Sequence, residues 1–245
     1  MKRRLHDNLR RIRDRIANAC LRADRSPEEV TLVAVTKSVG VDVIRQLLEL
    51  DCCVLGESRV QELSQRAAII SEQHKRLRDA GQEPPEPQWH LVGHLQRNKV
   101  KAVLPWVTCI QSLDSLRLAE DLDRWARKLD RKVDVLLQVN AAGEAQKSGI
   151  AVGAVNHLVE QIVSLPGLRV CGLMAMAPLE ADADALAWVF GRVREIFVDL
   201  CHEPFVGREF RHLSMGMSND FEMAVEHGAT MVRIGSALFD GVAGG

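Results

Sequence analysis

A lysine ends the first strongly apolar run of the chain. Residues 31–36 read Thr-Leu-Val-Ala-Val-Thr, and Lys37 follows at once. A short run of β-branched and aliphatic residues before a helical pattern is typical of a buried parallel strand. Because a lysine is costly to bury, we expect Lys37 at the carboxyl end of that strand, where functional residues gather in α/β folds. There its ammonium either reaches solvent or, when desolvated, becomes an amine that can form a Schiff base with a carbonyl.

A second group with chemical potential, Arg233-Ile-Gly235-Ser236, ends the last apolar run of the chain. Glycine lets a ligand approach the backbone closely. We expect a helix to begin at Gly235, because the free N–H groups and positive dipole end of a helix N-terminus suit a phosphate. Ser214 ends the preceding apolar run and would lie nearby. The alternative is that Gly235 makes only a tight turn.

Other chemistries lack the residue spacing that they need. No glycines precede Lys37-Ser38 at the spacing of a phosphate-binding loop. His90 and His94 flank a predicted strand instead of sharing a helix face, so a zinc pair is not expected. The six cysteines form no CxxC pair and lie mostly in apolar runs. We therefore expect reduced thiols, no metal site and a cytoplasmic protein.

Apolar runs alternate with helical patterns along the whole chain. The predicted strands are 31–36, 52–55, 89–92, 107–110, 133–139, 168–174, 210–214 and 230–234. Eight strand–helix alternations are typical of a (β/α)8 barrel, whereas an open doubly wound sheet uses the same alternation with fewer strands. The α/β fold that we predict is a single TIM barrel domain over residues 1–245, with an extra N-terminal helix in residues 1–25 packed on the barrel.

A barrel gathers the carboxyl ends of its strands around one mouth. In this sequence those ends carry Lys37, Glu57, His94, Ser112, Asn140, Met174, Ser214 and Gly235-Ser236. Barrel enzymes often bind phosphate after the last two strands, so the mouth combines a Schiff-base lysine with a phosphate site. This combination suits pyridoxal 5′-phosphate. A phosphate-binding aldolase also uses such a lysine, and it would carry no chromophore.

Composition excludes several classes of partner. The formal net charge of −1 gives no overall attraction to nucleic acid or to an anionic membrane. We interpret the arginines of the N-terminal helix as a solvated face and not as an RNA contact. No apolar segment approaches the length of a membrane span, and the N-terminus is not a signal peptide. Nothing indicates a coiled coil or a swapped arm, so a monomer is expected.

Several motifs together carry a resemblance to a known family. They are Leu32-Val-Ala-Val-Thr-Lys37, Gly56-Glu57, Gln61-Glu62, Trp89-His-Leu-Val-Gly93, Leu95-Gln96, Asn98-Lys99, Lys147-Ser-Gly149, Gly172-Leu-Met174, His212-Leu-Ser-Met-Gly-Met-Ser218 and Met231-Val-Arg-Ile-Gly-Ser236. With these motifs the chain resembles the pyridoxal phosphate homeostasis protein family from about residue 5 to about residue 240. This resemblance implies the barrel of the alanine racemase N-terminal domain.

The resemblance also implies site residues. Pyridoxal phosphate would be held as a Schiff base on Lys37, its phosphate by Ser214 and the backbone of Gly235 and Ser236, and its pyridine nitrogen by Arg233. Glu57, Asn140 and Met174 complete the expected cofactor-binding set. The family commonly reads Gly-Glu-Asn-Tyr after the second strand, whereas this chain reads Gly56-Glu57-Ser58-Arg59. Any pocket role of that asparagine or tyrosine is therefore not carried over to this chain.

The function that this resemblance implies is a carrier, not an enzyme. The protein would bind and buffer the cofactor for recipient pyridoxal phosphate enzymes. The alternative is a pyridoxal phosphate-dependent amino-acid racemase, which needs a second acid/base on the opposite face of its substrate. Alanine racemase-like enzymes use a tyrosine from a second domain, but this sequence contains no tyrosine and leaves no length for that domain. A cysteine, His94 or His212 could substitute.

Overall fold

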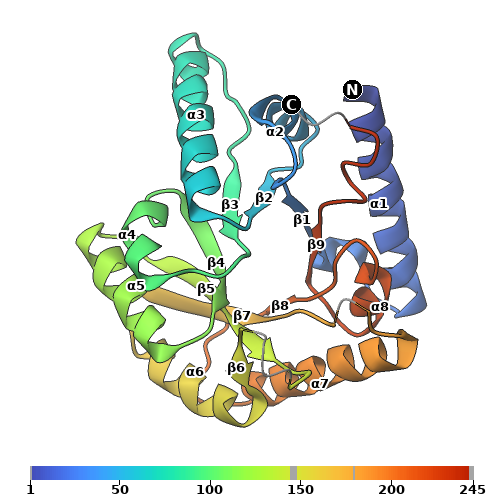
Figure 1. Ribbon diagram of the computed structural model, residues 1–245, viewed down its shortest axis with the longest axis vertical. Helices are drawn as coiled ribbons and strands as arrows, with labels where there is room; N and C mark the ends of the chain where they lie inside the picture. Colours follow the sequence, from blue (N-terminus) through green and yellow to red (C-terminus); the bar gives the residue numbers. More distant parts are fainter. Residues whose placement is uncertain (1, 144–147, 179, 243–245) are drawn as a thin grey trace.

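The strands form a closed parallel barrel surrounded by helices (Figure 1). The computed structural model describes residues 2–143, 148–178 and 180–242. Within them the barrel strands are, in order around the ring, β1 (Thr31–Val35), β2 (Val54–Glu57), β3 (Gln88–Leu91), β4 (Val107–Leu113), β5 (Val133–Asn140), β7 (Leu168–Ala175), β8 (His212–Ser214) and β9 (Met231–Ile234). Pairing of β9 with β1 closes the ring. The predicted (β/α)8 barrel is confirmed, and the ends of each predicted strand are displaced by no more than three residues.

One short strand was not predicted. Strand β6 (Ile150–Ala151) pairs with the last two residues of β5. The pairing of β4 with β5 ends at Leu113 and Leu137, so β6 takes the free side of β5 nearer the carboxyl ends of the strands. A two-residue strand is too short to show any hydrophobic period, so the sequence contains no pattern that could reveal it.

The helices lie outside the ring (Figure 1). They are α1 (Lys2–Arg22), α2 (Val41–Glu49), α3 (Val60–Asp79), α4 (Val100–Val103), α5 (Leu116–Lys128), α6 (Val155–Val163), α7 (Ala183–Cys201) and α8 (Phe221–Glu226), with short 3-10 turns at η1 (Pro27–Glu29), η2 (Arg97–Lys99) and η3 (Val152–Ala154). The expected N-terminal helix is α1, which buries Leu5, Leu9 and Ile12 and packs against α8. None of the helices among the described residues is long and apolar enough to cross a membrane.

The prediction of a helix beginning at Gly235 is wrong. The N–H groups of Leu238 and Phe239 both donate to the Gly235 carbonyl, at 3.0 and 3.1 Å, and the described chain then continues in turns. The amide of Asn8 on α1 donates to the carbonyls of Leu238 and Asp240 at 3.0 and 2.8 Å, so side-chain bonds occupy carbonyls that a longer helix would use. The helix-dipole argument for a phosphate site therefore does not apply, and only a backbone turn remains.

The barrel has a lumen that becomes polar toward its mouth. Its apolar part is made by Val33, Cys109, Leu136, Cys171, Met174 and Met231. Side chains two residues apart on a strand point the same way, so Gln111 follows Cys109 and Arg233 follows Met231 nearer the carboxyl ends of β4 and β9. Gln111 and Arg233 are both buried, as are His90 and Ser214. These buried polar groups form the floor of the candidate site.

Candidate functional site at the mouth of the barrel

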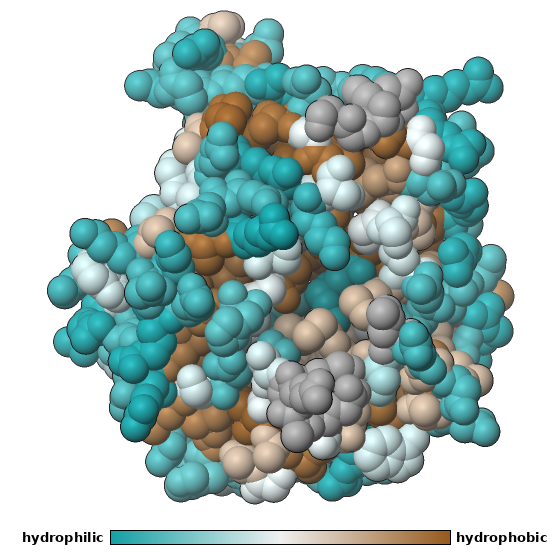
Figure 2. All heavy atoms as spheres, viewed as in Figure 1, coloured by the Kyte–Doolittle hydropathy of each residue, from teal (hydrophilic) through white to brown (hydrophobic). Residues whose placement is uncertain are grey.

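The mouth of the barrel is a hollow at the centre of the face seen in Figure 2, with hydrophilic atoms deep inside it. Lys37 lies two residues beyond the end of β1, in the turn that leads to α2. The position at the carboxyl end of the strand is the expected one. Lys37 is exposed, however, so the desolvation considered from the sequence is not provided by the protein itself.

Arg233 is the most unusual residue of the mouth, because its guanidinium is buried without an acidic partner in direct contact. Its exposed fraction is 4%, and burial lowers its pKa to about 10, so it stays charged at neutral pH. Nη1 donates to Ser214 Oγ at 2.8 Å, and Nη2 donates to the Ala175 carbonyl at 2.9 Å. Both acceptors are neutral. A guanidinium has five N–H donors, so these two bonds leave donors for another acceptor.

Ser214 lies in the lumen beside Arg233. Its hydroxyl accepts the bond from Arg233 and donates to Gln111 Oε1 at 2.7 Å, and its exposed fraction is 0%. Gln111 Nε2 in turn lies 2.8 Å from His90 Nδ1. The hydroxyl expected at a phosphate is therefore already bonded to two lumen side chains.

A different serine lies beside the turn after β9. Ser218 Oγ accepts from the N–H of Ala237 at 3.2 Å, so the loop after β8 and the turn after β9 touch here. Gly216, in the same loop, has a φ of +93°, and an added Cβ would lie 2.6 Å from the Cβ of Ala224. Gly235 is half-buried and Ser236 is exposed. These two loops bring backbone and one hydroxyl together at the rim of the mouth.

Glu57 faces the helix layer and not the lumen. A Cβ on the preceding Gly56 would contact Val33, which lines the lumen, so the next side chain points outward. Glu57 is fully buried, accepts from Thr36 Oγ1 at 2.5 Å and forms an ion pair with Arg66 of α3. Desolvation raises its pKa, and its second oxygen has no described partner. Arg66 also donates to the Thr36 carbonyl at 2.8 Å, so this cluster supports the residue before Lys37.

The remaining expected site residues lie at different depths. Asn140 is half-buried at the end of β5, where Gly149 of the neighbouring segment lies against its backbone. Met174 is fully buried among the apolar lumen residues. Lys147, part of the motif that carries the resemblance, lies outside the described residues.

The two histidines considered as acid/base groups, His94 and His212, lie in different environments. His94 is exposed at the rim, with Nδ1 3.2 Å from a carboxylate oxygen of Asp114. His212 is half-buried, and burial lowers its pKa. No group of three or more metal-ligating side chains occurs among the described residues.

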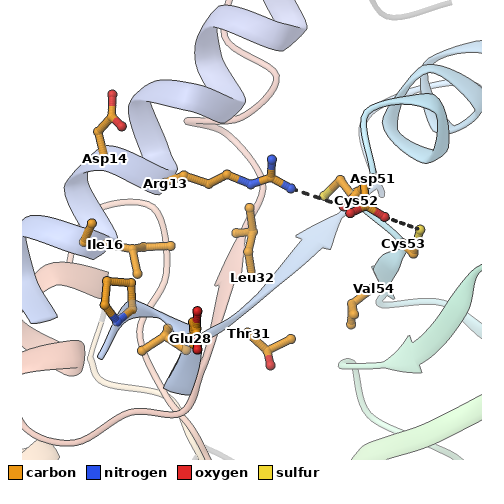
Figure 3. Close-up of a pocket in the computed structure, with 13 residues that line it drawn as sticks. Arg13, Asp14, Ile16, Glu28, Thr31, Leu32, Asp51, Cys52, Cys53 and Val54 are labelled. Carbon is orange, nitrogen blue, oxygen red and sulfur yellow. Dashed lines mark hydrogen bonds between the residues drawn. The ribbon is translucent and has the colours of Figure 1, made fainter. Parts of the chain in front are cut away.

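A separate cavity of the described structure lies away from the mouth. It measures about 520 Å³ and lies between α1 and the residues where β1 and β2 begin (Figure 3). Figure 3 shows Arg13 of α1 reaching the Asp51 backbone, whose carbonyl accepts at 3.2 Å. None of the expected site residues lines this cavity. Function in a parallel barrel concentrates at the opposite face, so we do not take this cavity as the site.

Sequence reasoning missed Gln111, His90, Ser218 and the pair Thr36–Arg66. The alternation of side chains along β4 indicates that Gln111 faces the lumen as Cys109 does, because the two residues are two positions apart on one strand. Ser218 belongs to the motif His212-Leu-Ser-Met-Gly-Met-Ser218, which contributes to the family resemblance. The prediction from sequence nevertheless places the Ser214 hydroxyl at the phosphate. Arg66 belongs to α3, and nothing in a helix sequence shows which strand residue it will reach.

Comparison with known proteins identifies the class of the barrel and then the family. Residues 3–242 match the family model described as alanine racemase, N-terminal domain. The pyridoxal phosphate homeostasis protein of Aquifex aeolicus is 38% identical over 95% of this chain and 96% of that protein. The protein of the same name from Escherichia coli K12 is 35% identical over 95% and 94%. The structure of PipY from Synechococcus elongatus with PLP (pyridoxal phosphate) bound has a TM-score of 0.76 at 33% identity, and covers 93% of this chain and 99% of that chain.

The fold is therefore that of an alanine racemase N-terminal domain. The identity to relatives over nearly their full length is specific enough to go further. The chain belongs to the pyridoxal phosphate homeostasis protein family. The resemblance seen in the sequence motifs is confirmed.

Proposed function

We propose that this protein binds pyridoxal 5′-phosphate as a Schiff base on Lys37 and holds it for other enzymes. The observation that supports this best is Arg233, a buried cation with neutral acceptors and spare donors beneath a mouth that carries a lysine. A heteroaromatic nitrogen that accepts a hydrogen bond satisfies such a group. Two relatives are named for pyridoxal phosphate homeostasis, and PipY has been solved with this cofactor bound.

The residues present fit the cofactor at its aldehyde, its ring nitrogen and its phosphate. Lys37 is exposed at the mouth and can reach a carbonyl group there. Arg233 offers an N–H to the pyridine nitrogen. We assign the phosphate to the rim where the Ser218 loop meets the turn at Gly235 and Ser236, because the Ser214 hydroxyl is already bonded in the lumen. This assignment replaces the Ser214 hydroxyl with that of Ser218 and keeps the expected backbone groups.

The chain's own side chains then have separate tasks. When bound, pyridoxal phosphate supplies an aldehyde that condenses with amines and a ring that withdraws electrons. Arg233 remains charged, so it donates a hydrogen bond to the ring nitrogen and disfavours its protonation. The buried lumen below Arg233 keeps water from that bond. Glu57 and Arg66 fix Thr36 and with it the turn of Lys37, while Asn140 and Met174, on β5 and β7, would hold the ring.

An unprotonated ring nitrogen suits a carrier better than a catalyst. A neutral ring is the weaker electron sink, so a bound amino acid would lose its α-proton slowly. We therefore propose that the protein stores and releases the cofactor to recipient pyridoxal phosphate enzymes. We also propose that it acts as a cytoplasmic monomer, because every group assigned to the site comes from one chain and no cysteine of the six forms a disulfide.

Attachment to Lys37 can be tested directly. The protein is incubated with the cofactor and reduced with borohydride, and its peptides are mapped by mass; the added mass should lie on the peptide of Lys37. Lys37→Arg keeps the positive charge and should lose the label and the near-visible absorbance. Lys75→Arg, at an exposed position of α3, is the matched control and should retain both. Label on another lysine, or none on the wild type, would overturn the proposal.

A further inference from the structure

Four side chains form a continuous hydrogen-bonded chain across the lumen. It runs from Arg233 on β9 through Ser214 on β8 and Gln111 on β4 to His90 on β3. The three links measure 2.8, 2.7 and 2.8 Å. The exposed fraction of each of the four residues is 4% or less. Two of them, Gln111 and His90, lie on the far side of the ring from Arg233 in strand order.

The directions of these bonds follow from the arginine end of the chain and from the Gln111 amide, whose oxygen faces Ser214. A guanidinium can only donate, so Ser214 Oγ must accept from Arg233. The serine proton is then available to the Gln111 carbonyl oxygen, which places the Gln111 amide nitrogen toward His90. An amide N–H₂ also only donates, so His90 Nδ1 must accept and carry no proton. With the Gln111 oxygen toward Ser214, the hydrogen-bonded chain requires a neutral His90 that carries its proton on Nε2.

The environment of His90 agrees with that state. The imidazole is buried beside the half-buried His212, and burial lowers the pKa of His90 to about 4. The imidazole is therefore neutral at physiological pH. Gln111 has one further contact, a weak one from Nε2 to the sulfur of Met231 at 3.8 Å. Without His90 the amide would keep no strong acceptor, and a buried amide without one is expensive.

We propose that His90 and Gln111 are positioning residues for the ring nitrogen of the bound cofactor, acting through Ser214 on the guanidinium of Arg233. The inference rests on the proposed function, because it assigns the bond that recognises the ring. No carboxylate of the described chain contacts Arg233, so two neutral acceptors, Ser214 and the Ala175 carbonyl, set its direction. The Ala175 carbonyl is fixed by the backbone of β7. The Ser214 hydroxyl can rotate, and the lumen chain holds it as an acceptor toward Arg233.

Two variants with the same number of side-chain heavy atoms separate this role from simple packing. His90→Asn places a carbonyl oxygen close to the position of Nδ1, so the Gln111 amide keeps an acceptor. His90→Leu has a similar volume and no acceptor, so the amide loses its partner and can rotate away from Ser214. Gln111→Met breaks both links with a side chain of the same length. Cys109→Ala, which lies two residues before Gln111 in the lumen, is the control for a small loss of packing.

The measurement uses pyridoxal phosphate with the heavy nitrogen isotope in its ring. The ring-nitrogen resonance reports the bond to Arg233, and an absorbance titration gives the affinity. His90→Leu and Gln111→Met should shift the resonance and weaken binding by about tenfold, the effect of one buried donor left unsatisfied. His90→Asn and Cys109→Ala should resemble the wild type. Circular dichroism of each variant without cofactor checks the fold. If His90→Leu does not fold, Gln111→Met is used in its place.

The experiment distinguishes a failure of this inference from a failure of the proposed function on which it rests. A wild type that bound no cofactor would overturn the proposed function and, with it, the inference. A wild type that binds normally, with His90→Leu and Gln111→Met unchanged in both resonance and affinity, would overturn the inference alone. An equal loss in His90→Asn and His90→Leu would also overturn it, because the acceptor at Nδ1 would then not be what matters.

Discussion

At the residue scale, the proposed site separates the lysine that would react with the cofactor from the arginine that would recognise its ring. Lys37 is exposed in a turn, whereas Arg233 is buried on a strand beneath it. An exposed ammonium needs no buried partner, and its deprotonated form, the amine, can condense with an incoming aldehyde. A buried guanidinium is tolerated only where hydrogen bonds replace its lost hydration, and the lumen supplies Ser214 and the Ala175 carbonyl for this purpose. The protein therefore fixes the recognising group firmly and leaves the reactive one accessible.

Gly235 offers a prediction at the same scale. A Cβ at this position would lie 3.3 Å from the Val35 carbonyl oxygen, so a branched side chain must displace the turn or project into the rim. We expect Gly235→Val to weaken cofactor affinity by about tenfold or more, as the loss of at least one backbone bond to phosphate would. Ser236→Ala keeps its backbone N–H and should cost less. Absorbance titrations measure both, and a larger loss in Ser236→Ala would show that the hydroxyl is the main contact.

At the scale of elements, helix α3 is tied to the turn that carries Lys37. Arg66 bonds both the Thr36 carbonyl and the buried Glu57 carboxylate, so α3, β1 and β2 meet at one ionic cluster. Burial raises the pKa of Glu57 above its ordinary value. A carboxyl group whose pKa is raised by folding favours the folded state most at pH values below its ordinary pKa. This contribution to the free energy of unfolding is lost as the pH rises through the pKa of the group in the folded protein. The ionised form of Glu57 is therefore stable only with the hydrogen bond from Thr36 and the ion pair with Arg66.

Thr36→Val removes one of these donors without a change of shape. We expect it to lower the free energy of unfolding by about 1–3 kcal/mol at pH values above the raised pKa of Glu57, because the ionised carboxylate then loses a hydrogen bond. The loss should shrink as pH falls and Glu57 becomes protonated. Urea unfolding over a pH series measures this. Thr108→Val is the control, because Thr108 Oγ1 donates to a backbone carbonyl at 3.1 Å and its effect should not vary with pH. A pH-independent loss in Thr36→Val would contradict the role of Glu57.

Some strands and helices could be predicted from the sequence, and others could not. Long, mostly apolar runs such as 133–139 and 168–174 predicted their strands closely, because a buried parallel strand consists mainly of apolar residues. The helix at Gly235 was wrong because its carbonyls are bonded by Asn8, which lies more than two hundred residues earlier in the chain. Contacts of that kind depend on the closed ring and leave no local pattern.

At the scale of the whole molecule, the closed ring makes the site out of distant residues. Lys37, Arg233 and the loop of Ser218 come from opposite ends of the sequence and meet because β9 pairs with β1. The sequence could predict that strand ends would share a mouth. It could not predict which side chains would face the lumen and which the helices, and for that reason Glu57 was expected in the pocket and His90 was not.

The whole molecule also bears on the proposal that the protein is a carrier and not a catalyst. A racemase needs acid/base groups on both faces of its substrate, and loss of one such group lowers the rate by about 10²–10⁴-fold. This chain has Lys37 at the mouth and no tyrosine, and His94 lies exposed at the rim against Asp114. We therefore expect the loaded wild type to exchange cofactor with a recipient enzyme while L-alanine keeps its optical activity.

Arg233→Glu sharpens this last test. A carboxylate stabilises a positively charged ring nitrogen, so the variant should favour the protonated ring and loosen the α-proton of a bound amino acid. Proton resonance in deuterated water should show faster α-proton exchange of L-alanine in Arg233→Glu than in the wild type, with little loss of optical activity, because one face still lacks its acid/base. Lys37→Arg serves as the blank. Rapid racemisation by the wild type would mean that a second acid/base group acts at the mouth, and the carrier function would be wrong.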